Sequence, residues 1–221
     1  MTARGAPTSA ASAVLVVATG NAGKLGELRA LLADLALRVE GLAAHPGVAL
    51  PEEGDDYEAN ARAKARAAAR ALGLPALADD SGIEVDGLGG APGPRSARFG
   101  GPGLDDAGRV ARLLRELAAR PGASRRARFV CVAALATPEG GEAAARGVCE
   151  GRIAAAARGS GGFGYDPVFE VDEPGLRDGR TMAELAPEEK ARVSHRARAV
   201  AALRPRLAAL AARHANAAKI S

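Results

Sequence analysis

The sequence predicts an α/β fold, in which helices flank a central mixed and twisted sheet and two lobes enclose an active-site cleft. Short β-branched apolar runs alternate along the chain with apolar residues at helical spacing. One pair of apolar runs is joined by a glycine-containing turn, which indicates an antiparallel hairpin and therefore a mixed sheet. The chain has 221 residues, of which 48% are hydrophobic. This is enough to bury a full core.

The first dozen residues are predicted to be a disordered extension. Residues 1–12 lack the apolar stretch of a signal peptide, and no later run approaches the roughly 20 apolar residues of a membrane span. We therefore expect a cytoplasmic protein that makes no membrane contact. Residues 13–214 are expected to form a single domain, followed by a C-terminal tail over 215–221.

The first element of the domain predicts a strand, a loop and a helix. Residues 14–18 read VLVVA, and leucines recur at helical spacing from Leu25 onward. Between them lies TGNAGK, which would present backbone amides and Lys24 to a phosphate at a helix N-terminus. Gly20 and Gly23 would let a ligand approach the backbone. The GxxxxGK[ST] spacing of a P-loop is absent, and a purely structural turn remains an alternative.

The middle of the chain predicts alternating strands and helices. A strand is expected over residues 37–42, followed by a polar loop and an alanine-rich helix over 57–72 that Gly73 ends. The stretch PALADDSG should be a short strand that ends at its acidic residues, and a helix should follow over 105–120.

The last third predicts a hairpin and two helices. RFVCVAALAT, the turn PEGGE and the stretch up to Val148 form the expected hairpin, and the segment over 159–171 runs from a glycine-rich loop into a strand. Two helices should follow Pro187 and Ser194. Cys131 and Cys149 form no metal-spaced set, so we expect buried free thiols.

Three carboxylates are candidates for a magnesium site, because Mg²⁺ takes one or two protein carboxylates and fills its octahedron with phosphates and waters. They are Glu52, Asp79 and Asp80. Adjacent residues of a strand point to opposite sides, so only one of the two aspartates should face a shared cleft. The alternative is an Asx-turn that only terminates the strand.

Two further segments could bind the base of a nucleotide. Phe163 lies in the thin loop GGFGYD and could stack on a planar base. His195 lies at a predicted helix N-terminus beside Arg196, where it could bond carbonyl oxygens of a ligand. A solvated first-turn histidine is the alternative. The order of residues suggests no Ser-His-Asp or Cys-His pairing, which disfavours a covalent mechanism.

The charge distribution permits a phosphate-bearing partner without indicating nucleic acid. The net charge is +4, and acidic residues are interleaved with basic ones. The basic residues include only four lysines, of which Lys24 and Lys190 fall in motifs expected to contact phosphate. We therefore expect no nucleic-acid partner.

The ordered motifs resemble those of the inosine triphosphatase-like (Ham1-like) family of noncanonical purine nucleoside triphosphate pyrophosphatases. The resemblance extends from Val14 to about Leu210. It rests on five motifs, which are ATGNAGKLGEL, PEEGDDYEANARAKA, PALADDSGIEVDGLGGAPGPRSARFGG, GSGGFGYDPVF and TMAELAPEEKARVSHRARA. One departure is Ala197, where a glycine often follows the His-Arg pair.

The resemblance implies hydrolysis of dITP, ITP and XTP to the monophosphate and pyrophosphate by a Mg²⁺-dependent homodimer. It implies that Asp80 is the proton acceptor and a metal ligand, and that Glu52 is the second ligand, with Glu53 adjacent. Lys24 and Lys190 would neutralise phosphate charge. The implied substrate-binding residues are Thr19, Gly20, Asn21, Ala22, Gly23, Lys24, Ser81, Phe163, Gly164, Tyr165, Asp166, Lys190, His195 and Arg196.

Two other functions compete with this hypothesis. One is a nucleotide pyrophosphatase of a different base specificity. The other is a noncatalytic protein that binds nucleotides or RNA, which would need exposed stacking rings on a basic face. Aromatic residues make up only 3% of the chain, which disfavours this second alternative.

Overall fold

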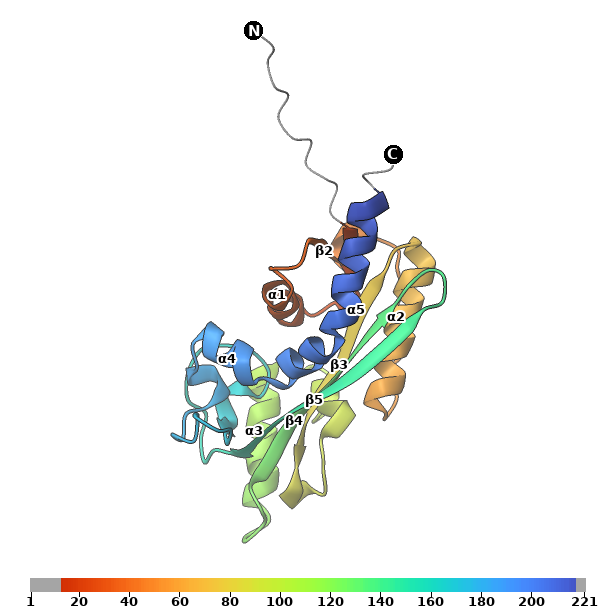
Figure 1. Cartoon of the computed structure of the whole chain (residues 1–221). Coiled ribbons are helices and arrows are strands. Elements are labelled where there is room, and N and C mark those ends of the chain that lie inside the picture. Colours follow the sequence, from red (N-terminus) through yellow and green to blue (C-terminus); the bar gives the residue numbers. More distant parts are fainter. Residues whose placement is uncertain (1–12, 218–221) are drawn as a thin grey trace.

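The computed structural model describes residues 13–217, which form one six-stranded sheet with helices on both faces (Figure 1). The strand order is β2-β1-β3-β4-β5-β6. The first three strands in this order are parallel and the others pair antiparallel, which confirms the predicted mixed sheet. The strands are β1 (Ala13–Val17), β2 (Leu37–Gly41), β3 (Ala76–Val85), β4 (Arg126–Ala136), β5 (Glu142–Ile153) and β6 (Phe169–Val171).

Five α-helices begin where the sequence offers a capping residue or a proline. Asn21, Asp56 and Asp105 each accept a hydrogen bond from a first-turn amide, and Gly73 ends the second helix in the left-handed conformation. The helices are α1 (Ala22–Leu31), α2 (Tyr57–Leu72), α3 (Asp106–Ala118), α4 (Pro187–Val193) and α5 (His195–Ala217). The last helix therefore passes the boundary expected at residue 214, and the extension expected over residues 1–12 lies outside the described residues.

The two faces of the sheet are covered differently. Alanines of α2, such as Ala61 and Ala65, pack on one face, where their small side chains let the helix approach closely. Leu28 of α1 and Leu203 of α5 cover the other face. A third apolar cluster joins α3 to the far ends of β3, β4 and β5, so the fold has a second lobe around residues such as Leu113.

Strand β3 continues through the acidic pair, so the expectation that it ends there is wrong, and the alternative of an Asx-turn is excluded as well. Asp79 and Asp80 pair with Ala133 and Val132 of β4, and the antiparallel ladder runs on to Val85. Pairing with β1 stops at Leu77, so β3 has an uncovered edge beyond that residue. The edge lies at the carboxyl end of the parallel strands, which is where ligands bind in open α/β sheets.

The two cysteines are buried free thiols, as predicted. Burial raises the pKa of both thiols, that of Cys149 to about 12, so neither is a reactive thiolate near neutral pH.

The lengths and compositions of the helices bear on membrane contact. Within residues 13–217, none is long and apolar enough to cross a membrane.

Candidate active site

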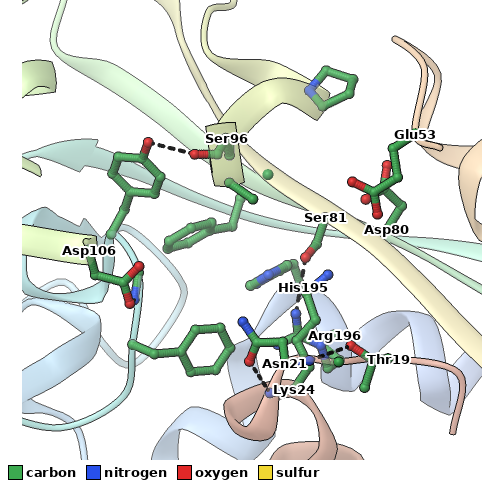
Figure 2. A pocket seen from close by; sticks show the side chains of 18 of the residues that line it. Thr19, Asn21, Lys24, Glu53, Asp80, Ser81, Ser96, Asp106, His195 and Arg196 are labelled. Atoms are coloured by element: carbon green, nitrogen blue, oxygen red, sulfur yellow. Dashed lines mark hydrogen bonds between the residues drawn. The ribbon is translucent and has the colours of Figure 1, made fainter. Parts of the chain in front are cut away.

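A cavity of about 350 Å³ lies at the uncovered edge of β3 (Figure 2). Its wall is formed by the loop after β1, the middle of β3, the short segment Gly93–Arg98, the start of α3, the glycine-rich loop and the start of α5. Most of the predicted site residues line it. They are Thr19, Gly20, Asn21, Lys24, Asp80, Ser81, Phe163, Gly164, Tyr165, Asp166, Lys190, His195 and Arg196.

The loop after β1 is held by its own side chains. Thr19 Oγ1 accepts a hydrogen bond from the Asn21 amide at 3.1 Å, and Asn21 Oδ1 accepts one from the Lys24 amide at 3.0 Å. These two contacts fix the start of α1, and Thr19, Gly20, Asn21 and Lys24 line the cavity there.

The predicted role of Gly23 needs correction, whereas Gly20 lines the cavity. A Cβ on Gly23 would lie 2.6 Å from the Phe163 ring, whereas a Cβ on Gly20 would meet no atom within 4 Å. Gly23 therefore makes room for the aromatic ring rather than for a ligand at the backbone. Neither Gly23 nor Ala22 lines the cavity.

The structure separates the roles of the adjacent aspartates. Asp79 points to the α1 and α5 side, where it is fully buried and its Oδ2 lies 3.2 Å from Lys24 Nζ and 3.1 Å from Arg196 Nη2. Burial alone would raise the pKa of Asp79, but these two cations, with Lys64, hold it well below its usual range. Asp79 is thus a permanently charged anchor and does not line the cavity.

Asp80 points to the α2 side and faces the cavity. Its Oδ2 accepts a hydrogen bond from Asn60 Nδ2 at 2.8 Å, and its Oδ1 lies 3.6 Å from Lys64 Nζ. Burial raises the pKa of Asp80, although Lys64 and Asn60 oppose this. Asn60 and Lys64, which sequence reasoning did not assign to the site, lie four residues apart on one face of α2; this helical spacing within EANARAKA could have revealed them.

The second cavity carboxylate is Glu53, and the assignment of Glu52 is not supported by the geometry. Glu53 Oε1 accepts a hydrogen bond from Lys64 Nζ at 2.5 Å and lies near Asp80, as Figure 2 shows. Glu52 is exposed and does not line the cavity. Burial would raise the pKa of Glu53, but the Lys64 hydrogen bond and charge lower it below its usual value. The turn is fixed by Asn60, which bonds the backbone of Gly54.

Glu53 and Asp80 fit a magnesium ion by the chemistry of their donors. They are two oxygen ligands on one wall of the cavity, and Mg²⁺ takes one or two carboxylates together with phosphate oxygens and waters. A single ammonium group, that of Lys64, balances the two carboxylates in the structure. A complete protein-only cage is not formed among the described residues, where no cluster of three His, Cys, Asp or Glu side chains could hold a metal.

The glycine-rich loop is tied down at several points. Asp166 Oδ2 accepts hydrogen bonds from the Phe163 amide at 2.9 Å and from Lys190 Nζ at 2.5 Å. The Gly164 amide donates to Asp106 Oδ2 at 2.7 Å, and the buried Tyr165 hydroxyl donates to the Ser96 carbonyl at 2.9 Å. Tyr165 and Asp166 thus anchor the loop and leave the Phe163 ring free to face the cavity.

Arg196 is deeply buried and nearly saturated with hydrogen bonds. It donates to Asp79, Glu27 and Ser81, using four of its five N–H groups. Glu27 also pairs with Lys190 at 2.6 Å and so joins two predicted site residues. Sequence reasoning did not identify Glu27, although it lies within the quoted motif ATGNAGKLGEL.

His195 is buried and lines the cavity, which excludes the alternative of a solvated first-turn histidine. Its ring stacks on Phe129 with centroids 4.7 Å apart, and its Nδ1 atom has no hydrogen-bond partner. Burial lowers the pKa of His195 well below its usual value, so the ring is neutral at pH 7. Ser194 Oγ accepts from the Ala197 amide at 3.2 Å and fixes the helix start that carries His195.

Comparisons with known proteins identify the family of this chain. A model of the Ham1 family matches residues 15–206. A dITP/XTP pyrophosphatase of Symbiobacterium thermophilum is 52% identical over 197 residues, covering 89% of this chain and 95% of that protein. A second, from Geobacillus kaustophilus, is 49% identical, with 86% and 91% covered. The solved structure of a HAM1 protein from Coxiella burnetii has a TM-score of 0.78 and 41% identity, covering 88% of this chain and 98% of that one.

Proposed function

This chain belongs to the Ham1 family, and on that premise we propose that it hydrolyses noncanonical purine nucleoside triphosphates. The substrates are dITP, ITP and XTP, and the products are the nucleoside monophosphate and pyrophosphate. Such an enzyme keeps deaminated purines out of DNA and RNA. The relatives named above are dITP/XTP pyrophosphatases that match this chain over most of their length.

The observation that carries the proposal is the arrangement of the cavity. Glu53 and Asp80 lie at one end, and the buried His195 and Arg196 lie away from them (Figure 2). Lys64 bonds Glu53, and the Phe163 ring lies 5.7 Å from the Arg196 guanidinium. A triphosphate needs cations and a metal, and a purine needs a stacking surface with hydrogen-bonding groups. The cavity offers both along one wall.

Magnesium is the proposed cofactor, held by Glu53 and Asp80. When bound, Mg²⁺ would neutralise phosphate charge and polarise the phosphoryl oxygens. Lys64 bonds Glu53 and lies close to Asp80, so it keeps the two carboxylates near one another without a metal. Asn60 fixes the orientation of Asp80 through Oδ2 and leaves Oδ1 for a further contact.

Asp80 is the proposed proton acceptor. Water would attack the α-phosphorus, the bond to the bridging oxygen of the β-phosphate would break, and pyrophosphate would leave intact. The proton of the water passes to Asp80, whose pKa burial raises, which makes it a better base than an exposed aspartate. The barrier falls by stabilisation of charge, with no covalent intermediate.

The phosphates are proposed to lie against the start of α1. The loop held by Thr19 and Asn21 lines the cavity at the positive end of the α1 dipole, and Lys24 lines the cavity beside it. Lys24 and Lys64 are the cations on this side. Lys190 lies 5.1 Å from the centroid of the Phe163 ring, so we place it near the base instead of the phosphates.

Recognition of the base is proposed to depend on donors at its 6-position. Hypoxanthine and xanthine present an acceptor there and adenine a donor. The one remaining N–H of Arg196 would bond the 6-oxo group and oppose an amino group. Phe163, which Gly23 allows to pack on α1, supplies the stacking surface.

A substrate panel tests the proposal. ITP, dITP and XTP should be hydrolysed with Mg²⁺ at least about a hundredfold faster, in kcat/KM, than ATP and GTP, because a site built for one hydrogen-bonding pattern leaves donors unpaired with another. Release of pyrophosphate, measured for all five nucleotides, checks this. Equal turnover of the five would contradict the specificity.

Two finer features come from the family resemblance. We propose a homodimer, which a mass measurement in solution would test. We also propose that the protein acts in the cytoplasm, where the nucleoside triphosphates that it consumes are made and used. Fractionation of cells carrying the tagged full chain would test this.

A further inference from the structure

Arg109 of α3 is a cavity residue that none of the roles above uses. It lines the cavity, its side chain is 22% exposed, and its Nε atom is buried without a hydrogen-bond partner. Its Nη1 atom donates to Asp106 Oδ1 at 3.0 Å. An arginine stays charged at all accessible pH values, and a buried donor without a partner is costly, so this guanidinium is suited to a ligand that accepts hydrogen bonds.

The groups around Arg109 cannot serve as that ligand. Asp106 already uses both oxygens, one for Arg109 and one for the Gly164 amide at 2.7 Å. The Tyr165 hydroxyl, the titratable group that faces Arg109 from the glycine-rich loop, donates to Ser96, and burial raises the pKa of this phenol. The buried Nε atom is out of reach of a ligand, but the guanidinium is partly exposed, and its Nη2 atom donates to no group among the described residues. The Nη2 donors are therefore left for whatever enters the cavity.

Arg109 lies at the end of the cavity remote from the reacting phosphate. In the ladder between β3 and β4, Asp80 pairs with Val132 and Ile83 pairs with Phe129. Phe129, which also lines the cavity, thus lies three residues along β4 from the partner of Asp80, a distance of roughly 10 Å from the proposed proton acceptor. Asp106, which bonds Arg109, lies on the side of the cavity opposite Glu53 and Asp80 in Figure 2. A nucleotide with its α-phosphate at Asp80 would direct its purine toward Arg109.

We propose that Arg109 reads the 2-position of the purine, favouring the 2-oxo group of xanthine and rejecting the 2-amino group of guanine. This inference rests on the proposed function. The 6-position is assigned to the remaining donor of Arg196, so the 2-position is the other edge that carries specificity. An amino group would set two donors against each other, whereas an oxo group is a matching acceptor.

The charge of Arg109 should make the preference for XTP over ITP depend on pH, because the base of XTP titrates and that of ITP does not. The xanthine base of XTP is acidic and loses a ring proton near neutral pH, while hypoxanthine stays neutral there. A fixed guanidinium beside the base favours the anion. The ratio of kcat/KM for XTP to that for ITP should therefore rise with pH, and because both substrates share one catalytic machinery, effects on that machinery cancel in the ratio.

The test compares Arg109→Met, which keeps the apolar stem, with Arg109→Lys, which keeps the charge. The matched control is Arg115→Met, an exposed arginine of the same helix that does not line the cavity. From about pH 5 to about pH 8 the XTP/ITP ratio of the wild type and of Arg115→Met should rise roughly three- to tenfold, the size of the difference between a charge-assisted hydrogen bond and a neutral one. It should stay flat in Arg109→Met and rise in part in Arg109→Lys. GTP turnover should increase in Arg109→Met.

The outcomes separate this inference from the proposed function. An unchanged rise of the XTP/ITP ratio in Arg109→Met, or unchanged GTP rejection, would overturn the role of Arg109 while the wild type still hydrolyses XTP and ITP. Failure of the wild type to hydrolyse either would instead refute the proposed function. ITP turnover in Arg109→Met shows that the variant is folded. Should it be inactive, the XTP/ITP ratio of Arg109→Lys and the relative binding of XMP and IMP to Arg109→Met decide the question.

Discussion

The carboxylate end of the cavity and the charged network beside it differ in how their positive and negative side chains are matched. In the network each charge has a buried or half-buried partner, and three cations meet three carboxylates: Lys24, Lys190 and Arg196 with Glu27, Asp79 and Asp166. At the carboxylate end, Glu53 and Asp80 share one ammonium group, that of Lys64. The first region is neutral as it stands, and the second has an excess of negative charge.

The difference separates structural from catalytic charge. A buried ion pair with complete hydrogen bonds is rigid, and its members cannot change partner without a large free-energy cost. Asp79 and Arg196 belong to that class. A carboxylate whose pKa burial raises, as for Asp80, is instead suited to a proton or a metal ion. Two neighbouring residues of one strand thus serve opposite purposes because they face opposite sides of the sheet.

The largest expected effect on stability comes from Asp79. Asp79→Ala would leave Lys24 and Arg196 without their shared partner, and breaking such a buried pair costs about 3–5 kcal/mol of the free energy of unfolding. Asp80→Asn is the matched control, and it should cost little because burial disfavours the charged form of Asp80. Urea denaturation of both variants checks this. Equal destabilisation would remove the distinction between the two regions.

The next effect distinguishes the adjacent glutamates. Glu53→Gln should lower kcat about a hundredfold and raise the Mg²⁺ concentration needed for half-maximal rate, because it removes a charged oxygen from the cavity wall. Glu52→Gln should stay within about twofold of the wild type, since surface changes have small effects. Magnesium titrations of both variants measure this. A larger loss of kcat in Glu52→Gln than in Glu53→Gln would show that Glu52, the residue that the sequence indicated, is the metal ligand.

A smaller effect is expected from pH and His195. Because burial holds the pKa of His195 below that of the unfolded chain, its contribution to stability is full above about pH 6.5 and falls as pH drops. The unfolded state then binds a proton that the folded state excludes. The free energy of unfolding falls by at most about 1.4 kcal/mol per pH unit, and His195→Gln should remove this dependence on pH. Denaturation of both proteins at about pH 7.5 and about pH 5.5 measures the difference, and identical slopes would contradict a buried neutral ring.

The sequence predicted the fold and the residues whose signal is local. The β1, loop and α1 motif, the hairpin and the helix ends each depend on a few neighbouring residues, such as Asn21 and Gly73. The continuation of β3 past Asp80 could not be predicted from local turn preference, because it depends on pairing with β4, which lies about fifty residues further along the chain.

Residues that reach the cavity through tertiary contacts were harder to predict than those that belong to a local sequence motif. Glu53 differs from Glu52 only in which side of the turn it faces, and Asn60 sets that turn from α2. Asp106 and Arg109 reach the cavity from α3, a helix whose sequence shows only an apolar face. Tertiary contacts, not sequence spacing, bring them to the nucleotide site.

The central claim is that the carboxylate end breaks the bond while the paired network positions the nucleotide. Asp80→Asn tests it most directly, since the amide keeps the shape of the side chain and removes the proton acceptor. We expect ITP to bind within about threefold of the wild type and turnover to fall by about a thousandfold, within the range for loss of a general base. Turnover by Asp80→Asn near the wild-type rate, with ITP bound equally well, would contradict the account.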